Sequence, residues 1–238
     1  MFKIFSYCGS AQYPSISNNI SREFLLRLTN TMEKEFSIKH YKCDQVKIDL
    51  VNNVNQFIKP QEAMNTPDDM PMIANQMLNS NMIVFSTPVY FKNVSAGMKV
   101  LLDRITGWTH SFELVGKFGV CIVCGSQNGS KETLKYMEDF MIRLGLGSIQ
   151  FIEYNTNNNS VSELNQKINI SVNTLVDRIN NSRPPLPTDR QIEIYENYKK
   201  LFLTEGINDA EHKIWIEKQK NNENLNLKDI MGKNSVSY

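Results

Sequence analysis

Residues 81–104, NMIVFSTPVYFKNVSAGMKVLLDR, decide the fold. Residues 82–85 form a short apolar run, typical of a strand that is buried on both faces. We expect 86–88 to end this strand, because Pro88 cannot donate to a strand ladder. After a loop over 89–94, Ser95 is suited to cap a helix, whose apolar face is marked by Met98, Leu101, Leu102 and Ile105. The stretch therefore predicts a strand, a loop and a helix in succession.

The same unit recurs on both sides of this stretch. Residues 3–8 predict a strand and lead through a polar loop into a helix, and residues 117–124 do the same. Further strands are expected at 37–48 and 148–154, followed by a closing helix that ends near residue 181. Strands that alternate with helices favour an α/β fold with a doubly wound parallel sheet. In such a sheet, ligands bind at the loops that leave the carboxyl ends of the strands.

Length and composition exclude several classes of protein. The 238 residues fit one α/β domain with an appendage, and a net charge of +1 gives no broad field for nucleic acid or an anionic membrane. Residues 1–5 lead directly into a strand-like run, so we expect a cytoplasmic protein without membrane insertion. The four cysteines lie in or beside apolar runs, which favours reduced thiols. Cys121 and Cys124 form a C-x-x-C that we interpret as core thiols rather than as a redox pair.

The loop after the first strand carries hydroxyls and amides just before a helix. Free N–H groups and the dipole at a helix start favour an anion, so this loop is a candidate phosphate site. Ordinary helix capping explains the same residue types. Both interpretations stay open on the residues alone.

The segment 50–71 is polar and long for a loop, which indicates either a functional segment or an insertion. At its end, Asp68 and Asp69 precede a helix, and we interpret them as capping residues rather than metal ligands, because no histidine or further carboxylate accompanies them. The three histidines, His40, His110 and His212, are scattered. We expect them to be surface or packing residues, although His110 could reach a neighbouring active site, and the nearby Trp108 could form an interface or a pocket wall.

Residues 183–187, RPPLP, break the closing helix and divide the chain into 1–182 and 183–238. The second part predicts helices with an apolar stripe that includes Tyr195, Leu201 and Trp215. Such a stripe needs a surface to cover, either on its own domain or on a partner subunit. We favour a partner subunit, and therefore a homo-oligomer such as a dimer or tetramer.

The sequence resembles the flavodoxin-like NAD(P)H-dependent FMN reductases, which include multimeric quinone reductases and iron–sulfur flavoproteins. The resemblance covers roughly residues 1–181. It is carried by Asp68-Asp69-Met70, by 86–99, STPVYFKNVSAGMK, and by Asp103-Arg104. Residues 9–18 resemble the phosphate loop of the family, with Gln12 where arginine is usual. The stretch 57–67, where iron–sulfur members carry cluster cysteines, contains no cysteine.

This resemblance implies a five-stranded sheet of order 2-1-3-4-5 and an FMN site. The phosphate would be held by Ser10, Gln12, Ser15, Ser17 and Asn18. The isoalloxazine ring would lie between the loop of Pro88, Val89, Tyr90, Phe91, Asn93 and Val94 and the loop of Cys124, Gly125, Ser126 and Gly129. Tyr90 or Phe91 could cover a ring face, and simple packing explains them equally well.

The implied activity is transfer of hydride from NADPH or NADH, through FMN, to a quinone, a flavin or another small electron acceptor. No catalytic residue of the chain and no metal are implied. Two other functions stay open, a flavodoxin-type electron carrier and a binding module without cofactor. A flavoprotein dedicated to one metabolite or peptide would carry the same motifs, and the C-terminal extension could then supply its specificity.

Overall fold

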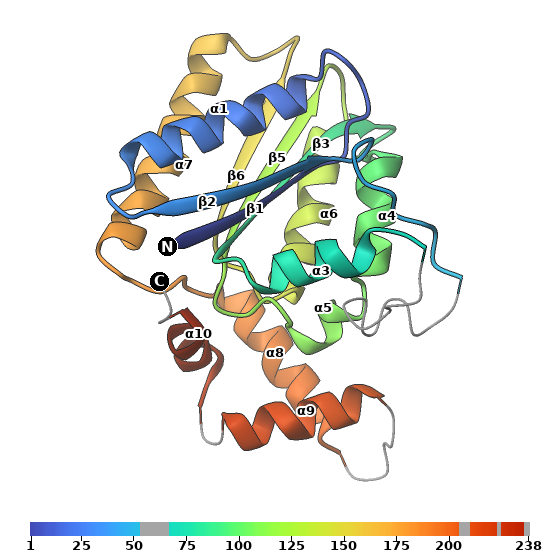
Figure 1. Cartoon of the computed structure of the whole chain (residues 1–238), viewed down its shortest axis with the longest axis vertical. Coiled ribbons are helices and arrows are strands. Elements are labelled where there is room, and N and C mark those ends of the chain that lie inside the picture. The colour runs from blue at the N-terminus through green and yellow to red at the C-terminus, as the bar shows by residue number, and fades with distance from the viewer. Residues whose placement is uncertain (53–66, 205–209, 223–224, 236–238) are drawn as a thin grey trace.

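The computed structural model describes residues 1–52, 67–204, 210–222 and 225–235. A parallel sheet forms its centre (Figure 1), with the long strands in the order β2-β1-β3-β5-β6. This confirms the expected order 2-1-3-4-5, since β4 is a short additional strand. The long strands are β1 (Phe2–Cys8), β2 (Phe36–Lys42), β3 (Met82–Tyr90), β5 (Phe118–Gly125) and β6 (Gly147–Asn155). β2 is shorter than the expected 37–48, and residues 53–66 of the irregular segment lie outside the described residues.

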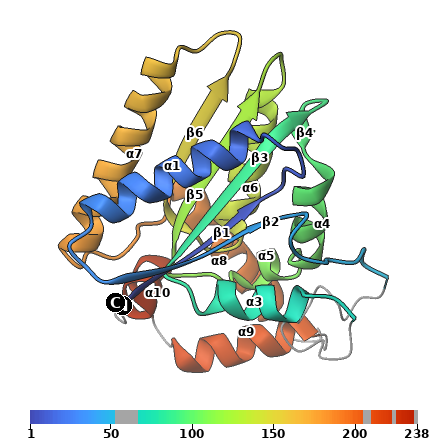
Figure 2. The same ribbon diagram turned by 45° about the horizontal axis from the view of Figure 1, so that its top comes forward.

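Helices cover both faces of the sheet, as a doubly wound fold requires (Figures 1 and 2). α1 (Ile16–Thr31) and α7 (Val161–Asn180) pack on one face, over a core that includes Phe24 and Val84. The opposite face carries α3 (Met70–Leu78), α4 (Ala96–Arg104), α5 (Trp108–Ser111) and α6 (Ser130–Arg143). None of the described helices is long and apolar enough to cross a membrane.

β3 runs further than the sequence predicts. It continues through Pro88 to Tyr90 and turns back into β4 (Asn93–Val94), so the expected loop 89–94 is a β-hairpin. Phe91 and Lys92 both have positive φ, 45° and 63°, as a tight hairpin turn requires. Ser86 bonds toward β1 through its carbonyl, so the nitrogen of Pro88 faces the same side, where β1 has already ended. The missing N–H of Pro88 therefore breaks no ladder.

The C-terminal extension forms α8 (Asp189–Phe202), α9 (Ala210–Asn221) and α10 (Leu227–Ser235), which lie below the sheet in Figure 1. They share a third core of Phe112, Tyr195, Trp215, Leu227, Ile230 and Met231. Trp215 is 1% exposed, and its Nε1 donates to the carbonyl of His110 at 3.0 Å.

Thus Tyr195 and Trp215 cover the chain's own domain, contrary to our preference for a partner subunit. The polar residues that surround Leu227, Ile230 and Met231 hid α10 in the sequence. The division at residue 183 and the role of the extension in assembly stay predictions.

Candidate functional site

The loop between β1 and α1 forms a cradle of donors. Ser15 caps α1, since its Oγ accepts the N–H of Asn18 at 3.2 Å, and Ser10, Ser15 and Ser17 are all buried. Within the described chain, six N–H groups of this loop and the first helical turn have no acceptor: those of Ser10, Ala11, Tyr13, Ser15, Ile16 and Ser17. The capping interpretation is confirmed, and the free donors allow an anion at the same place.

A chain of polar contacts runs from this cradle to β2. The Oγ of Ser15 lies 3.3 Å from that of Ser17, while the side-chain oxygen of Asn18 lies 2.8 Å from Nε2 of His40. Nδ1 of His40 lies 2.9 Å from Oγ of Ser6. Burial, and then the nearby charge of Arg22, lower the pKa of His40. Sequence reasoning missed this role of His40, because the contacts join distant segments and leave no local pattern.

The cradle is fixed against the start of α4. Ser95 caps that helix as predicted, accepting the N–H of Met98 at 3.2 Å, and its Oγ donates to the carbonyl of Gly9 at 2.6 Å. A Cβ on Gly9 would lie 2.6 Å from Cβ of Met98, so only glycine fits there. Ser86, at the same level of β3, has a fully buried Oγ without a hydrogen-bond partner in the described structure.

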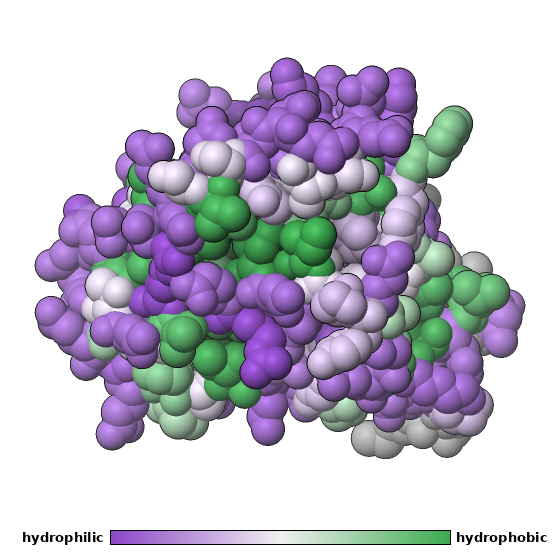
Figure 3. Space-filling view, turned by 90° about the horizontal axis from the view of Figure 1, so that it is seen from above, coloured by the Kyte–Doolittle hydropathy of each residue, from purple (hydrophilic) through white to green (hydrophobic). Residues whose placement is uncertain are grey.

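The hairpin β3–β4 lies beside the loop that follows β5. A Cβ on Gly129 would lie 2.7 Å from Cα of Lys92, and one on Gly125 would lie 3.4 Å from Cβ of Val89. The two loops therefore touch at these glycines. Figure 3 looks down on this edge of the sheet and shows apolar side chains gathered in the centre, ringed by hydrophilic ones.

Two asparagines that the sequence analysis did not single out hold the loop after β5. Nδ2 of Asn155 donates to the carbonyl of Gln127 at 2.9 Å, and Nδ2 of Asn157 donates to the carbonyl of Ser126. Asn155 is the last residue of β6, and Asn157 lies in the Asn-rich run that follows it. The sequence contained one signal for this role, because the Asn-rich run follows a predicted strand directly. The carboxyl ends of parallel strands share one edge of the sheet, so this run had to lie near the other loops.

The predicted site residues thus come together at one edge of the sheet from three segments. Among the aromatic candidates, Tyr90 is 48% exposed and Phe91 is 100% exposed at the hairpin tip. Cys124 is buried at the end of β5, where burial raises its pKa to about 12. Cys121 belongs to the core under α4 and α6 and Cys124 to the core under α1 and α7, which confirms that they face opposite sides of the sheet.

The acidic pair before α3 plays a structural part. Asp69 is the N-cap residue of α3, but its side chain makes no capping hydrogen bond and accepts the N–H of Lys47 instead, so the capping interpretation was wrong for this side chain. Asp68 accepts the N–H of Met70 at 3.2 Å and forms a buried ion pair with Arg104, which the sequence analysis missed. The part of the chain that the structure describes contains no group of three or more His, Cys, Asp or Glu residues that could hold a metal.

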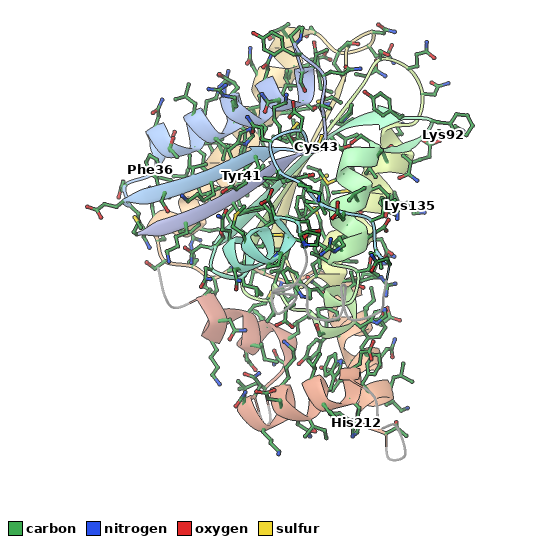
Figure 4. The ribbon with its side chains drawn as sticks, turned by 45° about the vertical axis from the view of Figure 1, so that its right-hand side comes forward. Phe36, Tyr41, Cys43, Lys92, Lys135 and His212 are labelled. Carbon is green, nitrogen blue, oxygen red and sulfur yellow. The ribbon has the colours of Figure 1, made fainter. Side chains whose placement is uncertain are left out.

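The extension lies far from this edge. Figure 4 shows Lys92 on the hairpin at one end of the molecule and His212 in the extension at the other. The ring of His110 packs against Phe202 and Tyr198, and Trp108 is buried in the core. Trp108 therefore forms neither an interface nor a pocket wall, and neither His110 nor the extension lies at this chain's own candidate site.

Comparison with known proteins adds the family. Residues 2–159 match the family described as NADPH-dependent FMN reductase. An iron–sulfur flavoprotein of Archaeoglobus fulgidus is 22% identical over 209 residues, which cover 86% of this chain and 94% of that protein. One from Methanocaldococcus jannaschii is 29% identical over 114 residues, 46% of this chain and 58% of that protein, so the match spans little more than half of that relative.

Solved structures share the fold. The structure of RosB with a bound riboflavin-phosphate intermediate has a TM-score of 0.60 at 13% identity, covering 88% of this chain and 90% of that one. An apo NADH:FMN oxidoreductase, EMOB, has a TM-score of 0.56 at 14% identity, covering 74% of this chain and 89% of that one. At these identities the likeness concerns the fold alone.

Proposed function

Because the chain belongs to the NADPH-dependent FMN reductase family, we propose that it is an FMN-dependent oxidoreductase that uses NADPH or NADH to reduce a small electron acceptor. Bound FMN supplies the redox chemistry, since its ring can take a hydride from a nicotinamide and pass electrons to a second substrate. Quinones and flavins are the acceptor classes we favour. We also propose a homo-oligomer, dimer or tetramer, in the cytoplasm.

The observation that carries this proposal is the cradle at the start of α1. The N–H groups of Ser10, Ala11, Ile16 and Ser17 are free in the described structure, and the hydroxyls of Ser10, Ser15 and Ser17 are buried beside them. Such donors suit a phosphate monoester. The residues present therefore fit the phosphate of FMN, with Gln12 adding a neutral amide rather than a cation.

The hairpin and the loop after β5 would support the ring. Pro88, Val89 and Val94 would offer apolar contact, and the N–H groups of residues 125–129 would donate to the ring carbonyls. Tyr90 and Phe91 are exposed enough to cover a ring face. Hydride transfer between two bound rings requires no protein acid or base, so the chain's task is to position the rings and exclude water.

Anaerobic spectroscopy tests the proposal. The purified protein is mixed with FMN, freed of excess flavin, and titrated with NADPH or NADH while the visible flavin absorption is followed. We expect a bound flavin spectrum that bleaches within the time of mixing. A bound flavin that stays oxidised would point to an electron carrier, and a protein that retains no FMN would contradict the proposal.

A further inference from the structure

A pocket adjoins the phosphate cradle and shares part of its loop. It has a volume of about 420 Å³ and is lined by residues 12–15 of the loop, by Asn18, Asn19 and Arg22 of α1, by Lys42 at the end of β2, and by Gln45. Its volume lies within the range typical of small-molecule sites. The pocket combines two cations, an aromatic ring and four side-chain amides, which is a lining suited to a phosphorylated heterocycle.

Arg22 is the most informative of these residues. The chain has seven arginines, and the other six bond to a carboxylate or a carbonyl: Arg27, Arg104, Arg143, Arg178, Arg183 and Arg190. Arg22 alone has no hydrogen bond or ion pair with any described residue. Its neighbour Glu23 pairs with Arg27 instead. The guanidinium therefore keeps its full donor capacity for a ligand.

Lys42, at the end of β2, adds a second positive charge to the lining. Its side chain is only 14% exposed and contacts Asp44 at 3.0 Å, and Asp44 does not line the pocket. Nor does any other carboxylate among the described residues, so an anion in the pocket meets no like charge there. The arrangement resembles a phosphate clamp in its chemistry, with an arginine fork and a lysine.

Tyr13 supplies the apolar surface. It is 96% exposed, and an exposed aromatic ring beside cations and amides is a platform on which a nucleobase can stack. The side chains of Gln12, Asn19 and Gln45 offer both donors and acceptors for a base or a ribose.

We propose that this pocket binds the 2′-phosphorylated adenosine end of NADPH, with Arg22 and Lys42 on the 2′-phosphate and Tyr13 against the adenine. The inference rests on the proposed function and makes the enzyme selective for NADPH over NADH. Arg22 lies six residues beyond Ile16, about 9 Å along the helix axis, which separates it from the donors of the flavin cradle. The pocket shares Gln12 and Ser15 with that cradle, so the two ligands would be neighbours.

The test uses the FMN-loaded protein and two probes, 2′,5′-ADP and 5′-AMP, each titrated by calorimetry. We expect 2′,5′-ADP to bind at least about tenfold more tightly than 5′-AMP, and Arg22→Gln and Lys42→Gln to weaken 2′,5′-ADP by about tenfold or more each. Lys39→Gln is the matched control, since Lys39 is an exposed cation on the same strand outside the pocket, and it should change neither affinity.

Kinetics and flavin binding supply independent readouts. Arg22→Gln should raise KM for NADPH and leave KM for NADH and the affinity for FMN unchanged. Equal binding of the two probes, or an unchanged KM for NADPH in both variants, would overturn the proposal. A loss of FMN affinity in Arg22→Gln would overturn it too, by assigning the arginine to the flavin phosphate. If NADPH or NADH reduces the flavin but 2′,5′-ADP does not bind, the assignment of this pocket is wrong. The proposed function would not be affected by that result.

Discussion

Arg104 and Asp68 form an ion pair in which neither side chain is exposed to solvent. The Asp68 carboxylate also accepts the N–H groups of Asp49 at 3.0 Å and Met70 at 3.2 Å, and Arg104 donates to the carbonyl of Asp49 at 3.0 Å. One carboxylate thus joins α3, α4 and the segment before the irregular loop. Asp68 and Arg104 lie at the two ends of the sequence pattern that resembles the family, and they bind each other. Asp68 therefore has a structural role.

Removing one partner of this pair leaves the other charge buried. We expect Asp68→Ala to lower the free energy of unfolding by about 3–5 kcal/mol, the cost typical of breaking a buried ion pair. Asp69→Ala is the matched control, because Asp69 only accepts the N–H of Lys47 at 2.8 Å and should lose about 1 kcal/mol. Urea unfolding of both variants makes the measurement, and equal losses would contradict a special role for Asp68.

Gly129 is expected to matter for the flavin site more than for the fold. Its φ of 112° is strained for any other residue, and a Cβ there would strike the backbone of Lys92 at 2.7 Å. Gly129→Ala should therefore push the hairpin away from the loop after β5 and weaken FMN binding by at least about tenfold. Gly232→Ala, in α10 with nothing within 4 Å, should leave FMN binding unchanged. Fluorescence titration of FMN compares the two, and equal affinities would show that the loops need not touch.

The cysteines should differ in reactivity. Cys43 is half-buried, and burial, with the nearby Asp44, raises its pKa to about 11, while Cys8, Cys121 and Cys124 are buried. Burial raises the pKa of Cys121 and Cys124 as well, so below a pH of about 9 these two and Cys43 should be protonated thiols that alkylate slowly, while burial shields Cys8 from the reagent. We expect iodoacetamide to label Cys43 first in the native protein, with the other three labelled after unfolding, as mass spectrometry would show. Rapid labelling of Cys121 and Cys124 would contradict their role as core thiols.

Acid should destabilise the fold through His40. Its pKa is lowered in the folded state from 6.5, by burial and by Arg22, so the unfolded chain binds more protons as the pH falls. The stability that neutral His40 contributes is fully present above its unfolded pKa and is lost as the pH falls through its lower folded pKa. Urea unfolding from about pH 8 to about pH 5 should show that the free energy of unfolding decreases as the pH falls, and this dependence on pH should be weaker in His40→Gln. An unchanged slope in His40→Gln would assign the acid sensitivity to other groups.

The sequence predicted the elements whose causes are local. The helix cap at Ser95 and the apolar runs of β1, β3 and β5 depend on neighbouring residues, and all were predicted. The predicted end of β3 at residues 86–88 was wrong. Whether Pro88 interrupts the hydrogen bonds of the sheet depends on where β1 ends, which the sequence does not show. Likewise, the pairing of Asp68 with Arg104 depends on how α3 and α4 pack together, which composition and periodicity do not predict.

The extension posed the same problem on a larger scale. An apolar stripe in a sequence indicates that it is buried but does not identify the surface that buries it. Here Tyr195 and Trp215 pack with Phe112 of the same chain. Of the candidate site, the sequence predicted which loops meet. It could not predict that the loops touch, nor that Asn155 and His40 support them, because those contacts arise only after the sheet has formed.

Trp215 should separate stability from function. It is 1% exposed, its ring stacks on Phe202 at 6.3 Å, and its Nε1 donates to His110. Trp215→Ala should therefore lower the free energy of unfolding by about 3–5 kcal/mol, the range for truncating a buried aromatic. Leu201→Ala, at a position 53% exposed on α8, should cost far less. Because the extension lies at the amino end of the strands, the FMN affinity of folded Trp215→Ala should equal that of the unaltered protein. A variant that stays folded and loses FMN would show that the extension reaches the flavin site, which could occur only through a neighbouring subunit.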